Sequence, residues 1–225
     1  MRIIVFGATG GLGQWTWKAA VKAGHDVVAF VRSPQKLDDG DPGFGRLEVV
    51  KGDATDGDAV AAGCGGCEAL VNCTSPAGGN STIELARSIV THGSASGVKQ
   101  FYMVGGLGAL WAPNTGRSVL VQDWEDAEGM AAVGLSAAMP RDMIRKMTKG
   151  HLASMALLAE LGVAHTFLCP GMMKDAPPTS TRVVTLDEVG GTQAGQVTMG
   201  DVAEVIVADL GTGALLGHRV SVAAA

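Results

Sequence analysis

The sequence predicts an α/β fold with a doubly wound parallel sheet that helices cover on both faces. Two observations carry this prediction. Short apolar segments alternate with segments of helical periodicity, and the first of them, at 1–6, runs directly into a glycine-rich turn and a helix. The chain has 225 residues, 47% of them hydrophobic, and can bury one large core. We therefore expect a single domain spanning 1–225, with ligands bound at the carboxyl ends of the strands.

The elements of the first half follow in regular order. The helix opened by the glycines carries an apolar stripe that begins at Leu12 and ends at Ala23. Strands are expected at 25–31, 47–51, 68–73 and 99–104. Helices at 58–62 and 80–93 separate the later strands. Because strand and helix alternate, we expect the strands to be parallel.

The second half departs from this alternation. Residues 106–140 are expected to form an irregular insertion, either a lid over the substrate side of the crevice or a loose surface excursion. A long helix at 141–161 follows, with an apolar face made of Leu152, Met155, Ala156 and Ala159. The remaining expected elements are a strand at 164–169, a helix from the capping-box residues 198–201 to 210, and a strand at 219–222.

The segment Gly7-Ala8-Thr9-Gly10-Gly11-Leu12-Gly13 indicates a dinucleotide-phosphate site. Glycines between a strand and a helix permit a tight turn, close approach of a pyrophosphate, and a helix amino terminus directed at the anion. A glycine-rich turn without a ligand is the alternative, but the strand–turn–helix context favours the phosphate site. The residues expected to contact the cofactor here are Gly7, Thr9, Gly10, Gly11, Leu12 and Gly13.

The end of the second strand indicates which dinucleotide binds. Sites that prefer NAD place an acidic side chain there, which accepts a hydrogen bond from the ribose 2′-hydroxyl. This chain has Arg32 and Ser33, which suit the additional phosphate of NADP(H), so NADP(H) is the expected cofactor. Lys36 either assists or faces solvent. Asp53, with the backbone of Ala54, is expected to meet the adenine amino group, or else to cap the following helix.

Composition and charge argue against several other kinds of partner. The formal net charge is −5 and the basic stretch at 141–149 is short, so we expect no nucleic acid. Met1 stands one residue before the first strand, and no apolar run is long enough to span a bilayer, so we expect a cytosolic protein without a membrane partner. Cys64 and Cys67 lack a second pair at zinc spacing, which favours packing over metal binding or redox use. The expected partner is a small hydrophobic substrate, and the chain is a monomer or homodimer.

Four motifs together resemble the atypical short-chain dehydrogenase/reductases of the NmrA-like, NAD(P)H-binding type: GATGGLG at 7–13, FVRSP at 30–34, GDATD at 52–56 and VKQFYMVGG at 98–106. The second half is most similar to the biliverdin IXβ reductase (flavin reductase) type, through LWAP at 110–113, TKGH at 148–151, LGV at 161–163 and RVVTLD at 182–187. The resemblance implies a Rossmann-type fold in which the cofactor lies over the strand ends, near Thr74 and Pro170. It also implies a substrate stacked on the nicotinamide beneath loops of the second half.

The chain lacks three proton donors that such enzymes customarily carry. Tyr102 lies within an expected strand and has no lysine four residues on. Gly105-Gly106 stands where relatives often have a hydroxyl side chain, and Met172 stands where the biliverdin reductase has a histidine. The remaining polar candidate is His151, which falls roughly where isoflavone-reductase-type enzymes carry a catalytic lysine. Its imidazole can donate a proton near neutral pH, and a capped or solvated side chain is its alternative role.

Hydride transfer to a conjugated acceptor needs chiefly a cofactor and substrate stacked in register, with the proton taken from water. The sequence therefore favours an NADPH-dependent reductase acting on a flavin, a quinone or a similar hydrophobic acceptor. The apolar side chains expected to line the substrate pocket, or alternatively to pack in the core, are Leu107, Leu110, Trp111, Met172 and Met173.

Two other classes of function fit the missing donors equally well. One is a redox-neutral isomerase or cyclase that keeps NADP(H) bound. The other is a non-catalytic, NADP(H)-binding regulator of the NmrA-like kind. Fold analogy alone does not choose among the three, and turnover of the cofactor separates them.

Overall fold

Strands and helices alternate through the computed structural model, which describes residues 1–74, 82–135, 140–179, 181–190 and 196–224. The first half contains β1 (Arg2–Phe6), α1 (Gly11–Lys22), β2 (Asp26–Val31), β3 (Leu47–Lys51), α2 (Gly57–Cys64), β4 (Ala69–Asn72), α3 (Thr82–Ala95) and β5 (Gln100–Val104). The second half contains α4 (Ala127–Ala132), α5 (Arg141–Glu160), β6 (Ala164–Leu168), β7 (Met172–Lys174), β8 (Arg182–Leu186), β9 (Gln196–Thr198), α6 (Met199–Asp209) and β10 (Arg219–Ala224). Short 3-10 helices lie at Pro34–Lys36 (η1), Phe44–Arg46 (η2), Leu107–Ala109 (η3) and Val121–Asp123 (η4). Within the described ranges, no helix is both long and apolar enough to cross a membrane.

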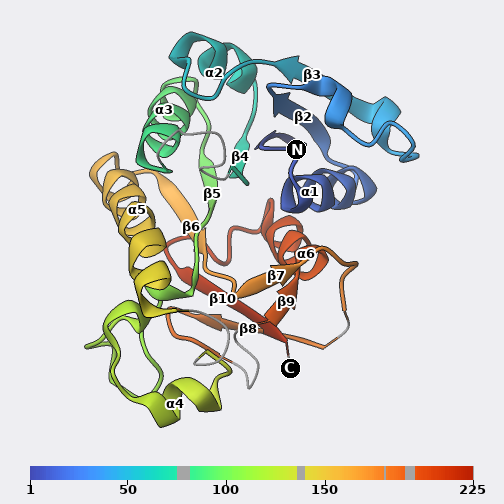
Figure 1. The fold of residues 1–225 in the computed structure, drawn as a ribbon. Coiled ribbons are helices and arrows are strands. Elements are labelled where there is room, and N and C mark those ends of the chain that lie inside the picture. Colours follow the sequence, from blue (N-terminus) through green and yellow to red (C-terminus); the bar gives the residue numbers. More distant parts are fainter. Residues whose placement is uncertain (75–81, 136–139, 180, 191–195, 225) are drawn as a thin grey trace.

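The central sheet has the strand order β3-β2-β1-β4-β5-β6-β10-β8 (Figure 1). Neighbouring strands from β3 to β10 are parallel, whereas β8 runs antiparallel to β10 at the edge. The strand order reverses between β1 and β4, which confirms the prediction of a doubly wound α/β fold. The sequence analysis did not predict β7, β8 or β9, and β7 and β9 form a separate parallel pair.

Alternate residues of the central strands enter two hydrophobic cores on opposite faces of the sheet. In β1, Ile4 and Phe6 pack with residues of α2, α3 and α5, whereas Ile3 and Val5 pack with residues of α1 and α6. All four side chains are fully buried, as expected for a central parallel strand. Helices cover both faces of the sheet (Figure 1), and because the strands are parallel their carboxyl ends meet at one edge. The loops that follow β1, β2, β3 and β4 come together there.

The insertion at 106–140 is packed into one of these cores. Leu110, Val121 and Leu135 are fully buried, and η3 and η4 lie against α5. The centre of the Trp111 ring lies 5.0 Å from the guanidinium carbon of Arg219 on β10. This cation–π contact holds the insertion against the β10 end of the sheet. This packing differs from the loose excursion considered from the sequence, and the lid role stays a prediction. The part at 136–139 lies outside the described residues.

The predicted apolar face of α5 is confirmed only in part: Leu152 and Met155 are partly buried and pack against the core. Ala156 and Ala159 are exposed, whereas Thr148, His151 and Ser154 are buried on the side that faces the sheet. The Ser154 hydroxyl donates to a backbone carbonyl of its own helix at 2.9 Å, so its burial leaves no unsatisfied group. The sequence pattern placed this face only in part because polar residues, not the largest apolar ones, line the part of α5 beside the strand ends.

Candidate functional site

The turn after β1 forms a cradle that requires glycine at two positions. Gly7 has a φ of +76°, and a Cβ there would lie 2.9 Å from the carbonyl carbon of Cys73. A Cβ on Gly13 would lie 2.1 Å from the Gly7 oxygen, so α1 packs directly on the turn. The Cβ position of Gly10 is 3.3 Å from the same oxygen, and Gly10 lines an open cavity. The first turn of α1 carries no acidic side chain, which suits its free N–H groups to an anion.

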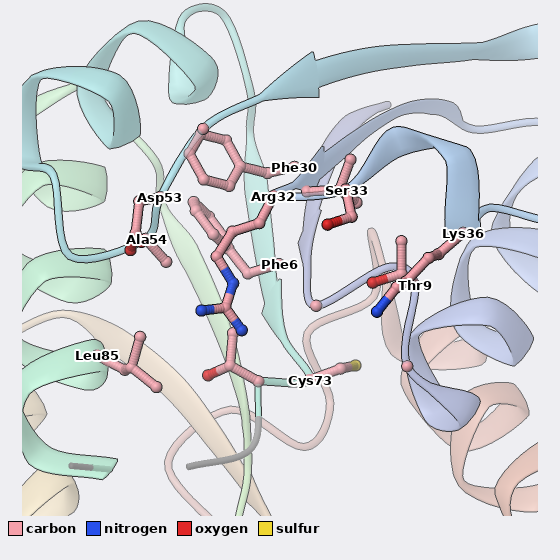
Figure 2. A pocket seen from close by; sticks show the side chains of 15 residues that line it. Phe6, Thr9, Phe30, Arg32, Ser33, Lys36, Asp53, Ala54, Cys73 and Leu85 are labelled. Carbon is pink, nitrogen blue, oxygen red and sulfur yellow. The ribbon is translucent and has the colours of Figure 1, made fainter. Parts of the chain in front are cut away.

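A cavity of about 300 Å³ lies beside this turn, at the ends of β1, β2, β3 and β4. Figure 2 shows Arg32 reaching into it from the end of β2, with Lys36 and Thr9 on one side and Asp53 and Ala54 on the other. Within the described part of the chain, the Arg32 guanidinium makes no hydrogen bond and no ion pair. Two cationic side chains therefore line the cavity next to the phosphate cradle, and Arg32 is available to an anionic ligand.

Asp53 lies on the opposite wall of the cavity, directly after β3. Its carboxylate accepts from the Thr55 N–H at 2.9 Å and from the Thr55 hydroxyl at 2.8 Å. These bonds, together with the nearby Arg32 guanidinium, hold the pKa of Asp53 below its ordinary value. The cap of α2 is Asp56, which accepts from two N–H groups of the first turn. Asp53 is therefore not the helix cap, and its ionised carboxylate is an acceptor on the cavity wall.

These residues fit a dinucleotide, with a glycine cradle for the pyrophosphate, cations for a further phosphate and a carboxylate for an amino group. The structure brings eight of the predicted cofactor residues to this cavity: Gly7, Thr9, Gly10, Arg32, Ser33, Asp53, Ala54 and Thr74. Four others do not line it. Gly11, Leu12 and Gly13 belong to the first turn of α1, and Pro170 is buried after β6.

The cavity also has apolar walls that the sequence analysis did not name. The rings of Phe6 and Phe30 lie with their centroids 4.7 Å apart at the ends of β1 and β2, and Leu85 of α3 lies across from them. Their position near the last residue of a parallel strand is the signal that could have found the two rings. Cys73 lines the same cavity, but burial raises the pKa of its thiol to about 12, so it is not an activated nucleophile.

A second cavity, of about 30 Å³, lies between the ends of β4, β5 and β6 and the helices α3 and α5. Thr74 lines both cavities, and Asn72 and His151 line the second. The His151 side chain is buried, its Nδ1 has no hydrogen-bond partner, and burial lowers its pKa. The cavity exceeds the roughly 10–15 Å³ that one water needs. A neutral imidazole nitrogen is therefore available here to a water or a ligand, and the capped or solvated role for His151 is excluded.

Packing closes position 105, directly after β5, to a hydroxyl side chain. A Cβ on Gly105 would lie 2.1 Å from the ring of Phe167, which is fully buried. Tyr102 points to the other face of the sheet and donates to the Asp209 carboxylate of α6 at 2.9 Å. Burial raises the pKa of the Tyr102 phenol, whose role is therefore this structural hydrogen bond. His151 is thus the one titratable side chain among those that line the second cavity.

The apolar residues expected to line a substrate pocket do not line either cavity. Leu107 and Leu110 belong to the hydrophobic core, with 2% and 0% of their surface exposed. Trp111 is half-buried at the sheet edge, Met172 is exposed on β7, and Met173 packs toward α1 and α6. The alternative role of core packing therefore applies to Leu107 and Leu110, because the insertion that carries them folds into the core.

The pair Cys64 and Cys67 is part of the hydrophobic core. Cys64 and Cys67 are buried free thiols, and burial raises the pKa of Cys64 to about 12. Within the described ranges, no cluster of three or more His, Cys, Asp or Glu side chains could hold a metal ion.

Comparison with known proteins identifies the family of the chain. The model of a family of NAD(P)H-binding proteins matches residues 7–212, which include the glycine cradle, Arg32, Asp53 and His151. The chain belongs to this NAD(P)H-binding family. The resemblance drawn from the sequence motifs is confirmed, and the cofactor of the site is a nicotinamide dinucleotide.

Solved structures of other proteins share the fold of this NAD(P)H-binding protein. A candidate NADH-flavin reductase of Streptococcus pneumoniae is 20% identical, with a TM-score of 0.78 and all of both chains covered. A candidate epimerase of Bacteroides thetaiotaomicron is 22% identical, with a TM-score of 0.77, 99% of this chain and 96% of that chain. The anaerobilin reductase ChuY of Escherichia coli O157:H7 is 19% identical, with a TM-score of 0.71, 98% of this chain and 96% of that chain. At these identities the likeness establishes the fold.

Proposed function

We propose that the protein is an NADPH-dependent reductase that transfers a hydride to a conjugated, apolar acceptor such as a flavin or a quinone. Arg32 is the observation that carries the choice of cofactor. Its guanidinium makes no hydrogen bond or ion pair with the described residues and lies in the cavity beside the phosphate cradle. It suits the 2′-phosphate of NADPH, and Ser33 and Lys36 line the same cavity.

The scarcity of proton donors supports the choice of acceptor. When bound, NADPH supplies the hydride, so the chain has to orient the acceptor and deliver or admit one proton. His151 is neutral at neutral pH because burial lowers its pKa, and Gly105 leaves no hydroxyl at the end of β5. A simple ketone needs a strong acid as its charge develops, whereas a flavin or quinone spreads that charge over its own ring system. The site therefore suits acceptors that stabilise themselves.

The names of two structural relatives agree with this class of reaction. One is a candidate NADH-flavin reductase and the other an anaerobilin reductase. Because their identity to this chain is low, these relatives support a reductase but do not indicate which acceptor it uses.

The test is the oxidation of NADPH by a panel of acceptors, followed by the loss of absorbance of the reduced nicotinamide. We expect turnover with riboflavin and with a simple quinone, and little turnover with a simple ketone or aldehyde. Gly10→Val is the matched control, because it blocks the cradle without a backbone collision of the kind found at Gly13. Binding of NADPH without oxidation by any flavin or quinone would overturn the proposal.

A redox-neutral isomerase or cyclase that retains NADP(H) is the second candidate. The neutral imidazole of His151 and the lack of a hydroxyl side chain at 105 favour it, and one structural relative is a candidate epimerase. Product formation without net consumption of cofactor would establish this function. Tight NADPH binding with neither activity would instead support a non-catalytic regulator.

A further inference from the structure

A third cavity lies along the flank of α1, next to α6. Its volume is about 480 Å³, which is within the range of small-molecule pockets. The two helices pack side by side and form two of its walls (Figure 1), and the segment 41–46 forms another, so we call it the α1–α6 cavity. None of the described residues that line it also lines the dinucleotide cavity. It is therefore a separate site.

The walls that flank α1 are held in place by contacts of their own. On one side, the Asp41 carboxylate accepts from the Gly43 N–H at 2.8 Å and pairs with Lys18 at 3.4 Å. On the other side, a Cβ on Gly200 would lie 2.3 Å from the Pro178 nitrogen, so α6 and the segment between β7 and β8 touch backbone to backbone. The packed chain itself therefore forms the cavity, and a ligand does not have to open it.

The α1 wall is apolar at one end and cationic at the other. Trp15, Ala19 and Lys22 are spaced four and three residues apart, so they lie on one face of the helix over a rise of about 10 Å. The Trp15 indole N–H donates to the Asp175 carboxylate at 2.8 Å, which fixes the ring at the apolar end. Two prolines of the other walls add apolar surface. A ligand that fills this cavity has an apolar body about 10 Å long.

The two carboxylates that line the α1–α6 cavity are already paired. Glu204 of α6 lies 2.8 Å from Arg182 of β8, and Asp41 is paired with Lys18. A cationic ligand would have to compete with the arginine and the lysine for these two groups. The acidic residues of the cavity therefore do not select a cation.

Two cations of the same cavity have no carboxylate partner among the described residues. The Lys22 ammonium, in the last turn of α1, makes no hydrogen bond and no ion pair there. The Arg46 Nη1 donates to the Val21 carbonyl at 2.9 Å, which brings the guanidinium to the residue that precedes Lys22. A guanidinium has five N–H donors, so this bond leaves others for a ligand. An anionic group at this end of the cavity would pair with both side chains.

We propose that the α1–α6 cavity binds a small amphiphilic anion, an apolar ring system or chain that carries one carboxylate, sulfonate or comparable group. The apolar body packs against Trp15 and Ala19, and the anion pairs with Lys22 and Arg46. A concave cavity with apolar walls and a few convergent polar groups suits a free small molecule, since a protein partner needs a much larger surface. This site goes beyond the proposed reductase function and does not depend on it.

Two fluorescent probes that differ by one charge test this site. They are anilinonaphthalene sulfonate and phenylnaphthylamine, which has the same rings without the sulfonate, and both are titrated against the full chain in excess NADP⁺. We expect the sulfonate to bind more tightly. Lys22→Gln should raise its Kd at least about threefold and change the Kd of the neutral probe by less than about twofold. Lys146→Gln, which removes an exposed cation of α5, is the matched control and should change neither Kd.

Ala19→Phe tests the apolar wall. A ring at position 19 occupies the middle of the cavity, so both probes should lose at least about tenfold in affinity. Ala159→Phe, on the exposed face of α5, should leave both affinities unchanged, and circular dichroism reports whether each variant is folded. The proposal is overturned if a folded Ala19→Phe variant binds both probes normally or if Lys22→Gln weakens both probes equally. Absence of binding to the wild type, or binding that NADP⁺ abolishes, overturns it as well.

Discussion

At the scale of single residues, Arg32 is the side chain that we propose sets the preference for NADPH over NADH. We expect Arg32→Ala to weaken NADPH binding by about 10–100-fold, since a hydrogen bond to a charged group contributes about 1.5–3 kcal/mol. NADH has no 2′-phosphate and its affinity should change little. Calorimetric titration of both cofactors measures the effect, and Arg32→Lys, which keeps the charge, should lose less. Equal losses for NADPH and NADH would show that the phosphate is not bound there.

His151 is the second residue whose change is informative. If its imidazole delivers the proton, His151→Gln should lower kcat by about 10²–10⁴-fold and leave the Kd for NADPH unchanged. Burial lowers the pKa of this group, so its protonated form is lost as pH rises through a value below the ordinary one of about 6.5. The wild-type rate should therefore fall across that acidic range, and the variant should show no such limb. A kcat within about tenfold of the wild type would leave water as the proton source.

The position of a single residue could be predicted from the sequence where that residue directly follows a strand. Arg32 and Asp53 follow β2 and β3 directly, and both reach the same cavity because parallel strands end at one edge. For Leu107 and Leu110 the sequence left two roles open, because nothing in their local sequence separates the wall of a pocket from the core.

At the scale of elements, the turn from β1 into α1 gives the clearest contrast between two glycines. A Cβ on Gly13 would lie 2.1 Å from the backbone of Gly7, whereas the Cβ position of Gly10 lies at 3.3 Å and borders the cavity. We expect Gly13→Val to unfold the protein or lower its melting temperature strongly. Gly10→Val should keep a native circular dichroism spectrum and lose NADPH binding by at least about tenfold, since its side chain occupies the space of the pyrophosphate. Retained binding in a folded Gly10→Val variant would contradict the cradle assignment.

The elements that the sequence predicts well are those whose pattern is local. The strand–turn–helix at 1–22 and the capping box, in which Thr198 and Asp201 bond reciprocally, are both found as expected. Strand β8 was missed because its place in the sheet depends on an antiparallel partner, β10, more than thirty residues away. The face of α5 was predicted only in part: Leu152 and Met155 pack against the core as expected, but Thr148 and Ser154, which look like surface residues in the sequence, are buried as well.

At the scale of the whole molecule, the insertion after β5 belongs to the same core as the sheet. Leu110→Ala should therefore cost about 2–5 kcal/mol in the free energy of unfolding, as a buried leucine does. Urea denaturation measures it. The exposed Leu161→Ala should change the free energy of unfolding by no more than about 0.5 kcal/mol. A small loss for Leu110→Ala would show that the insertion unfolds independently.

The contact between Gly105 and Phe167 limits how the chain can change its chemistry over generations. A serine at 105 would collide with a buried ring, so it would first need a smaller residue at 167, and truncation of a buried phenylalanine costs about 3–5 kcal/mol. A lineage that took this route would cross a poorly folded intermediate. At Gly106 a single substitution is enough, because the Cβ position there lies 3.6 Å from the His151 ring and leaves room for a side chain. Descendants or designed variants that reduce ordinary ketones should therefore acquire their hydroxyl at 106.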